Sequence, residues 1–262
     1  MNKILLTLYI CIFSLPAFAT TFTGGVTKIG QEQSNRVIDS NTKQGIETAK
    51  ITIPQKNYRT YSDSNGNFEL PTIKIDQPTI INIEKEGYRP FSLTINNSQS
   101  LQKPMQIEIA KSEPFDIKLD NEIIHLGDDN YSKNSANASD FHVKSTGPYY
   151  SKDFIMTQNA KNSTNYLIIG SIVGLDTKMA KTMGQNKIKS GAYSSPAEVY
   201  FNNKKIAEIN INGDGQQIKI PSTLIKPDSK NQITIKTGQN MMASNHLDYD
   251  DIEIMNLSIL SE

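Results

Sequence analysis

The amino-acid sequence predicts an all-β protein that contains two β-sandwich domains in tandem. Apolar and polar residues alternate with a period of two in many short segments, as expected for strands that bury one face. Clusters of Gly, Pro, Asn, Asp and Ser separate these segments, as turns do. The longest helical pattern spans only residues 176–183. Many short strands joined by turns favour β-sandwiches over folds built from long helices.

The individual elements follow from the same two patterns. Alternation predicts strands at 49–53, 91–95, 105–109, 115–119, 218–220 and 233–235. Turn residues predict turns at 42–45, 63–67, 202–203, 212–215 and 226–231. Near the C-terminus, Ile252 and Ile254 have one parity, whereas Leu257 and Ile259 have the other. This switch predicts a β-bulge, or a strand that crosses between sheets, at 254–255.

Composition divides the chain into domains. We expect a first domain at 20–110, a polar and Pro-containing linker at 111–114, and a second domain at 115–262. Two polar stretches inside the second domain, 127–140 and 174–196, are long for connections in a compact domain. Loops of this length tend to be functional or mobile.

Residues 1–19 have the pattern of a cleaved secretory signal peptide. Lys3 precedes an apolar run from Ile4 to Leu15, and Ala17-Phe18-Ala19 is a small-residue cleavage signal. The alternative is a retained membrane anchor, but a span needs about 20 apolar residues. Cys11 is the only cysteine, so cleavage after Ala19 leaves no thiol for catalysis or metal binding. The sequence therefore predicts an exported protein, periplasmic or extracellular, without a stable transmembrane anchor.

Charge and motif content argue against several function classes. The chain has 27 Lys and Arg against 27 Asp and Glu, so it lacks the basic surplus typical of nucleic-acid binders. Gly170-Ser171-Ile172-Val173-Gly174 has its serine one place too early for a nucleophile elbow. The three histidines show no His-Glu-x-x-His pattern, so zinc chemistry is not expected. We therefore expect a protein that is not an enzyme.

The first domain contains a more specific pattern. The segment 36–90 includes Asp-Ser-Asn-Gly-Asn-Phe-Glu-Leu at 63–70 and Lys-Glu-Gly-Tyr-Arg-Pro at 85–90. In these motifs, Asn65-Gly66 suits a tight turn, Phe68 and Leu70 follow it toward the core, and Gly87 lets Tyr88 pack. Residues 22–110 resemble the carboxypeptidase regulatory-like domain, a seven-stranded sandwich related to transthyretin. The resemblance implies a non-catalytic appendage that acts as a spacer or interaction scaffold.

The second domain has a different resemblance. Its pieces are 125–131 (HLGDDNY), 199–209 (VYFNNKKIAEI), 220–238 (IPSTLIKPDSKNQITIKTG) and 248–259 (DYDDIEIMNLSI). Residues 113–262 are similar to galactose-binding-like jelly rolls, the fold of many carbohydrate-binding modules. This fold also binds lipids or proteins, so the ligand does not follow from the fold alone.

Acidic residues flank the first and last strands of this second domain. In the resembled jelly rolls a structural calcium ion often uses an acid just before the final strand, and hard cations take several oxygen ligands. The resemblance implies one structural Ca²⁺ with Asp250 as a ligand, and Asp251 or Glu253 lies near enough in the sequence to help. Asp128 and Asp129 would supply further oxygens if the first and last strands pair. We expect no other cofactor. The alternative is that these acids are solvated loop and cap residues.

A sugar site would combine exposed aromatic rings with planar polar groups, because sugars present both C–H faces and hydroxyls. The loops offer the candidates Tyr131, Tyr149, Tyr150, Tyr193, Asn130, Lys152 and Asn245. The alternative for each tyrosine is a half-buried ring with its hydroxyl in water. The chain has no Trp, which weakens the sugar hypothesis without excluding it.

Three functions stay open at this level. The favoured one is recognition of a polysaccharide or surface glycan by the second domain. The second is an assembly subunit of the periplasm or cell surface that binds a protein of the cell envelope. The third is a glycan-active hydrolase, which would need an acid together with a base or nucleophile about 5–9.5 Å apart.

Overall fold

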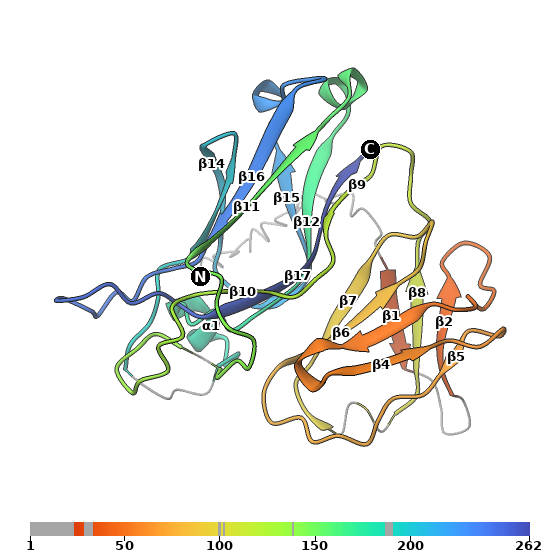
Figure 1. The fold of residues 1–262 in the computed structure, drawn as a ribbon, viewed down its shortest axis with the longest axis horizontal. Coiled ribbons are helices and arrows are strands. Elements are labelled where there is room, and N and C mark those ends of the chain that lie inside the picture. The colour runs from red at the N-terminus through yellow and green to blue at the C-terminus, as the bar shows by residue number, and fades with distance from the viewer. Residues whose placement is uncertain (1–23, 29–33, 99–100, 102, 138, 187–190) are drawn as a thin grey trace, which may run out of the picture.

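The computed structural model describes residues 24–28, 34–98, 101, 103–137, 139–186 and 191–262 (Figure 1). The predicted signal peptide lies outside these residues. The described chain is nearly all β and forms two sandwich-like units, which confirms the predicted fold class. None of the helices in the described ranges has the length and apolar composition of a membrane span.

The first sandwich, orange to yellow in Figure 1, consists of two four-stranded sheets. One sheet has the order β1 (Gly24–Lys28), β8 (Met105–Ile109), β2 (Asn35–Asp39) and β5 (Asn67–Phe68). The other has the order β4 (Tyr58–Tyr61), β3 (Lys50–Ile53), β6 (Thr79–Glu84) and β7 (Phe91–Ile95). Only β2 and β8 pair in parallel among these described strands. The described part of this sandwich has eight strands, whereas the resemblance implies seven.

The core of the first sandwich contains the apolar residues that the alternation pattern selects. Ile51 and Ile53 of β3 are fully buried, as are Ile107 and Ile109 of β8. They belong to one cluster, so the two sheets face each other through these side chains. Phe68 is also buried in this cluster, directly after the turn that contains Gly66.

The second sandwich consists of a five-stranded and a four-stranded sheet. The first has the order β10 (Ile124–Leu126), β17 (Ile252–Ser261), β12 (Asn165–Val173) and β15 (Gly213–Ile220), and β9 (Ile117–Asp120) also pairs with β17. The other has the order β11 (Tyr149–Ile155), β16 (Lys230–Lys236), β13 (Ala197–Phe201) and β14 (Lys204–Ile209). Aliphatic residues of both sheets and Phe154 and Phe201 fill the space between them.

Short helices occupy the connections. They are the 3-10 helices η1 (Pro54–Lys56), η3 (Gln158–Asn162) and η4 (Ser222–Leu224), and the α-helix α1 (Lys178–Thr182). α1 lies within the predicted helical segment 176–183. Thr177 caps it, because its hydroxyl accepts a hydrogen bond from the Ala180 amide at 3.0 Å. This cap fixes where the helix begins.

Several predicted turns are confirmed by backbone geometry. Asn202 and Asn203 both have positive φ angles, 47° and 65°, and connect β13 to β14 as a tight hairpin. Gly66 and Gly87 also have positive φ, at 83° and 80°. These positions favour residues that tolerate a left-handed backbone.

Two local predictions were wrong. Phe115 was expected on a strand face, but it is 45% exposed and β9 begins only at Ile117. A turn from Glu113 to Asp116 and the Arg89–Asp116 ion pair, at 2.7 Å, hold this segment outside the sheet. The turn predicted at 212–215 lies earlier, since β15 begins at Gly213. Hydrogen bonds from Gln185 and Leu175 hold Asn212, so the chain bends before Gly213.

The predicted irregularity of the last strand is present. Asn256 of β17 has a φ of 58°, and the pairing of β17 with β9 shifts register between Leu257 and Ser258. Ile252 and Ile254 before this point, and Leu257 and Ile259 after it, all reach the same core. The parity switch in the sequence therefore marks a β-bulge, slightly later than predicted.

The two sandwiches contact each other through polar side chains. β7 of the first lies against β12, β15 and β17 of the second. Asn256 donates a hydrogen bond to Asn82 at 2.8 Å, and Ser171 lies 2.9 Å from Ser92. The stretch predicted as a linker is also paired, since the Ser112 amide donates to the Gly87 carbonyl at 2.9 Å. The junction is thus built from specific bonds.

Candidate functional site

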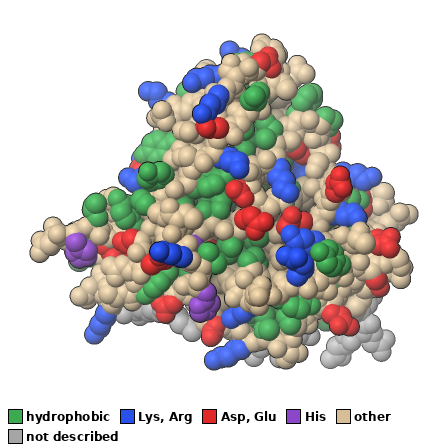
Figure 2. All heavy atoms as spheres, in the orientation of Figure 1, with side chains coloured by type: hydrophobic (Ala, Val, Ile, Leu, Met, Phe, Trp, Pro, Cys, Tyr) green, Lys and Arg blue, Asp and Glu red, His purple; other side chains and the backbone are tan. Residues whose placement is uncertain are grey.

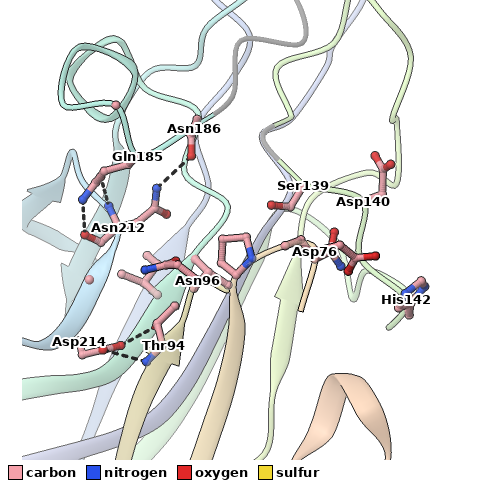
Figure 3. Close-up of a pocket in the computed structure, with 16 residues that line it drawn as sticks. Asp76, Thr94, Asn96, Ser139, Asp140, His142, Gln185, Asn186, Asn212 and Asp214 are labelled. Atoms are coloured by element: carbon pink, nitrogen blue, oxygen red, sulfur yellow. Dashed lines mark hydrogen bonds between the residues drawn. The ribbon is translucent and has the colours of Figure 1, made fainter. Parts of the chain in front are cut away.

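A cleft of about 850 Å³ opens at this junction, and both sandwiches line it (Figure 3). The first sandwich contributes Asp76, Gln77, Pro78, Thr94 and Asn96. The second contributes Ser139, Asp140, His142, Ile172, Val173, Gly184, Gln185, Asn186, Asn212, Gly213 and Asp214. The cleft depends on how the two sandwiches pack, because neither forms it alone.

Asp214 fixes one side of the cleft. Its carboxylate accepts hydrogen bonds from the Thr94 amide at 2.8 Å and from the Thr94 hydroxyl at 2.6 Å. The Ser171 hydroxyl also donates to it, at 2.7 Å. Since Thr94 lies on β7 and Asp214 on β15, these bonds hold the two walls in register (Figure 3).

Amide side chains on the other side form a connected network. The Asn212 amide donates to Gln185 Oε1 at 2.9 Å, and Gln185 Nε2 donates back to the Asn212 carbonyl at 2.9 Å. The Leu175 amide donates to Asn212 Oδ1 at 2.8 Å, and Asn212 Nδ2 lies 3.4 Å from Asn186 Oδ1. Such bonds pre-organise the side chains, which lowers the entropic cost of binding a ligand.

The chemistry of the lining is that of hydroxyls, amides and carboxylates. Among the described residues that line it, none is Lys or Arg, and His142 is the one with an aromatic ring. Over the face shown in Figure 2, acidic and basic side chains are interspersed without a large patch of one sign. The cleft is therefore suited to a polar ligand and offers little surface for stacking.

In the described structure, none of the seven predicted sugar-binding residues lines this cleft. Tyr149 is 61% exposed on β11. Tyr150, next to it, packs against the core, and its hydroxyl donates to Asp120 at 3.4 Å. Lys152 is exposed, with its Nζ 4.0 Å from the same carboxylate. These three residues do not form a common binding surface with the cleft.

The remaining four predicted residues lie in the loops around the last strand. Asn130 donates to Asp248 at 2.6 Å and so has a structural bond. Tyr131 packs between the two sandwiches beside Ile80 and Phe141. Tyr193 is half-buried and accepts a backbone hydrogen bond from Met241, whereas Asn245 is exposed. Their role in sugar binding stays a prediction.

The predicted metal ligands separate into distinct environments. Asp128 accepts hydrogen bonds from the amides of Tyr249 and Asn130. Asp250 is fully buried and accepts from the Asp176 amide at 2.9 Å and the Ser194 hydroxyl at 2.6 Å. Neither belongs to the cluster of possible metal ligands in the described structure. That cluster consists of Asp129, Asp251 and His125, and the sequence did not indicate His125 as a ligand.

Glu253 lies directly opposite His125, because the two residues are paired between the neighbouring strands β10 and β17. It is fully buried, and Gln55 of the first sandwich donates a hydrogen bond to its Oε2 at 2.8 Å. Burial raises the pKa of Glu253 to about 7, despite the opposing effects of Gln55 and His125. Burial also raises the pKa of Asp250 well above its usual range.

These residues do not fit a single calcium coordination sphere. Calcium prefers six to eight oxygen ligands. The carboxylates of Asp128 and Asp250 accept hydrogen bonds from separate groups of the protein, and the Asp251 carboxylate faces a nitrogen of His125. Calcium binding thus stays a prediction without a shared site among the five acids. The sequence missed His125 because its partner Asp251 is far away along the chain, and only strand pairing brings the two together.

Comparison with known families identifies the first sandwich. Residues 34–117 match the CarboxypepD_reg-like domain. No curated protein matches the chain. The match confirms the resemblance predicted for the first domain and extends beyond residue 110. The Arg89–Asp116 ion pair offers a reason, since it ties the segment after β8 to the CarboxypepD_reg-like domain.

Proposed function

We propose that the chain is an exported binding protein without enzymatic activity that recognises a polysaccharide or surface glycan. In this proposal the second sandwich is a galactose-binding-like jelly roll, and the glycan lies in the cleft at its junction with the CarboxypepD_reg-like domain. The observation that supports it best is the network of fixed amides and carboxylates on both walls, centred on Asn212 and Asp214.

The chemistry of sugars suits such a cleft. Each hydroxyl of a sugar both donates and accepts, so amides and carboxylates can pair with it on two sides. A ligand held by Asn96 on one wall and Gln185 on the other would contact both sandwiches. The CarboxypepD_reg-like domain would then be a wall of the site, a closer role than the spacer expected from its family.

The test is retention of the purified protein on a panel of immobilised polysaccharides, with calcium and with chelator. We expect retention on at least one polymer, weakened at least tenfold by Asn96→Ala or Gln185→Ala. Tyr149→Ala and Asn245→Ala are matched controls, because both residues are exposed and lie outside the cleft.

If the Tyr149 or Asn245 variants lose retention and the cleft variants keep it, the glycan site lies on the outer surface that the sequence indicated. If a folded protein is retained on no polymer, the glycan proposal fails.

A second candidate function is an assembly subunit that binds a protein of the cell envelope. The observation that favours it is the loop before β17, which projects in dark blue at the left of Figure 1. Its side chains Met241, Met242 and Leu247 are 57%, 62% and 70% exposed. Exposed apolar groups gathered in one loop mark interaction sites in many proteins. Loss of a cross-linked envelope partner on Leu247→Ser, with unchanged polysaccharide retention, would favour this function.

A further inference from the structure

We propose that His125, Asp129 and Asp251 form a binding site for a divalent transition-metal ion such as Zn²⁺, beside the junction of the two sandwiches. One ligand atom from each residue lies within 4.8 Å of the others. His125 is on β10, Asp129 is in the loop that follows, and Asp251 comes directly before β17. The proposal is independent of glycan binding, because these residues do not line the cleft.

The two ring nitrogens of His125 have different neighbours. Nδ1 lies 2.5 Å from the Val143 carbonyl oxygen, which can only accept, so Nδ1 must carry a proton. Nε2 therefore faces Asp251 Oδ1, at 2.9 Å. A carbonyl that accepts from one nitrogen and leaves the other for a metal is the usual arrangement of metal-binding histidines.

The nitrogen and oxygen that face each other need a cation between them. A lone pair on Nε2 would repel the Asp251 carboxylate, so either a proton or a metal ion must occupy this position. Zinc bonds to nitrogen and oxygen are about 2.0–2.2 Å long. Two ligand atoms about 3 Å apart are compatible with one such ion.

The local charge favours a divalent ion over a single proton. The carboxylates of Asp129 and Asp251 flank one imidazole, that of His125. Asp251 Oδ1 lies 2.9 Å from Nε2, whereas Asp129 Oδ1 lies 3.7 Å from Nδ1, and no other ion pair of either carboxylate is present among the described residues. A protonated His125 would compensate only one of these two charges.

Buried oxygens without a partner are the second, independent observation. Asp251 is fully buried and its Oδ2 has no hydrogen-bond partner in the described structure. The same holds for Oε1 of the fully buried Glu253. Buried acceptors without partners are rare because each has lost its hydrogen bonds to water without a replacement. A metal ion bound by Asp251 would give its carboxylate a partner.

The backbone is shaped to admit Asp251. A Cβ atom on Gly127 would lie 2.1 Å from Asp251 Oδ1, so no side chain fits at this position. Asp129 has a φ of 59°, which turns the chain back toward His125. A set of one imidazole nitrogen and carboxylate oxygens suits Zn²⁺ better than Ca²⁺, which prefers oxygen ligands alone.

The test is metal binding by the purified protein after removal of metals with chelator. We expect one Zn²⁺ per chain by elemental analysis and a higher melting temperature with ZnCl₂, whereas CaCl₂ gives no rise. Asp129→Asn, at a partly exposed position, and His125→Gln should each weaken zinc binding at least tenfold. The double variant His142→Gln/His246→Gln is the matched control, because it removes the other two histidines and should keep the bound zinc.

Three results would overturn the proposal. The first is no stoichiometric zinc in the wild-type protein, which would leave a proton as the cation between His125 and Asp251. The second is zinc that survives both Asp129→Asn and His125→Gln. The third is zinc that is lost only in the His142/His246 variant, which would assign it to the surface. If His125→Gln fails to fold, the wild-type titration and Asp129→Asn still decide.

Discussion

The two faces of β17 differ in chemistry although they share one strand and the same neighbours. On the inner face, Ile252, Ile254, Leu257 and Ile259 are fully buried in an aliphatic core. On the other face, Glu253 and Asn256 are equally buried but bond to polar side chains of the CarboxypepD_reg-like domain. Aliphatic packing holds the sheet together, whereas directional bonds set how the two sandwiches sit. The polar and titratable side chains of this strand are therefore on the second face.

The inner face should carry the largest energetic effect. Leu257→Ala removes a fully buried side chain and leaves a cavity, so we expect a loss of about 2–5 kcal/mol in the free energy of unfolding. Urea denaturation followed by circular dichroism measures it. Ile155→Ala, at a position 66% exposed, is the control and should change stability by less than about 0.5 kcal/mol. Equal effects of the two variants would contradict the assigned core.

The outer face should make stability depend on pH. The pKa of Glu253 is about 7 in the folded protein, above its ordinary value of 4.5. The stabilisation that protonated Glu253 gives the folded state is therefore complete below about pH 4.5 and is lost as the pH rises through about 7. In the metal-free protein His125 acts in the same direction, since burial lowers its pKa but hydrogen bonds to Asp251 and Val143 outweigh burial and raise the pKa overall. We expect a higher melting temperature at pH 5.5 than at pH 8.

Glu253→Gln tests whether this residue is the source. The amide keeps the size of the side chain but does not titrate, so the variant should melt higher than wild type at pH 8 and close to it at pH 5. Carboxyls with lowered pKa, such as Asp39 and Glu84, are ionised in both states above pH 5.5 and do not affect the comparison. A wild-type melting temperature that increases from pH 5.5 to pH 8 would contradict the assignment.

The amide pair across the junction should contribute less. Asn82 and Asn256 are both buried, and Asn82→Ala leaves the Asn256 amide without its acceptor. A buried donor without a partner costs about 1–3 kcal/mol. A double-mutant cycle with Asn256→Ala isolates the coupling between the two side chains. Zero coupling would mean that the packing of the sandwiches does not depend on this bond.

The sequence predicted the inner face better than the outer one for a physical reason. Burial in a sandwich imposes a period of two on neighbouring residues, so Ile51, Ile107 and the parity switch before Leu257 are visible locally. Turn residues such as Asn202-Asn203 are also local signals. Partners across the junction, such as Gln55 and Glu253, lie far apart in the chain and leave no periodic pattern. The cleft and the contact of His125 with Asp251 arise only from packing.

The same limit explains why the predicted site residues do not come together in the structure. Asp128 and Asp250 are acids in the expected places, but their carboxylates accept hydrogen bonds from Tyr249 and Ser194, respectively, which are distant from them in the chain. From the sequence, Tyr150 was expected in a loop. In the structure it lies on β11, which pairs with β16, and its ring packs against the core. Residue type therefore indicated the chemistry of the region, and the direction of each side chain required the fold.

The smallest effect is expected where a polar group has an alternative partner. The Ser171 hydroxyl lies 2.9 Å from Ser92 and 2.7 Å from Asp214, and it has a single proton to donate. After Ser92→Ala that proton can still go to Asp214, so no buried donor is left without an acceptor. We expect a loss below about 1 kcal/mol in urea denaturation, smaller than for Asn82→Ala at the same junction. A larger loss would mean that Ser92 acts through packing against Gly170, where an added Cβ would meet its Oγ at 2.6 Å.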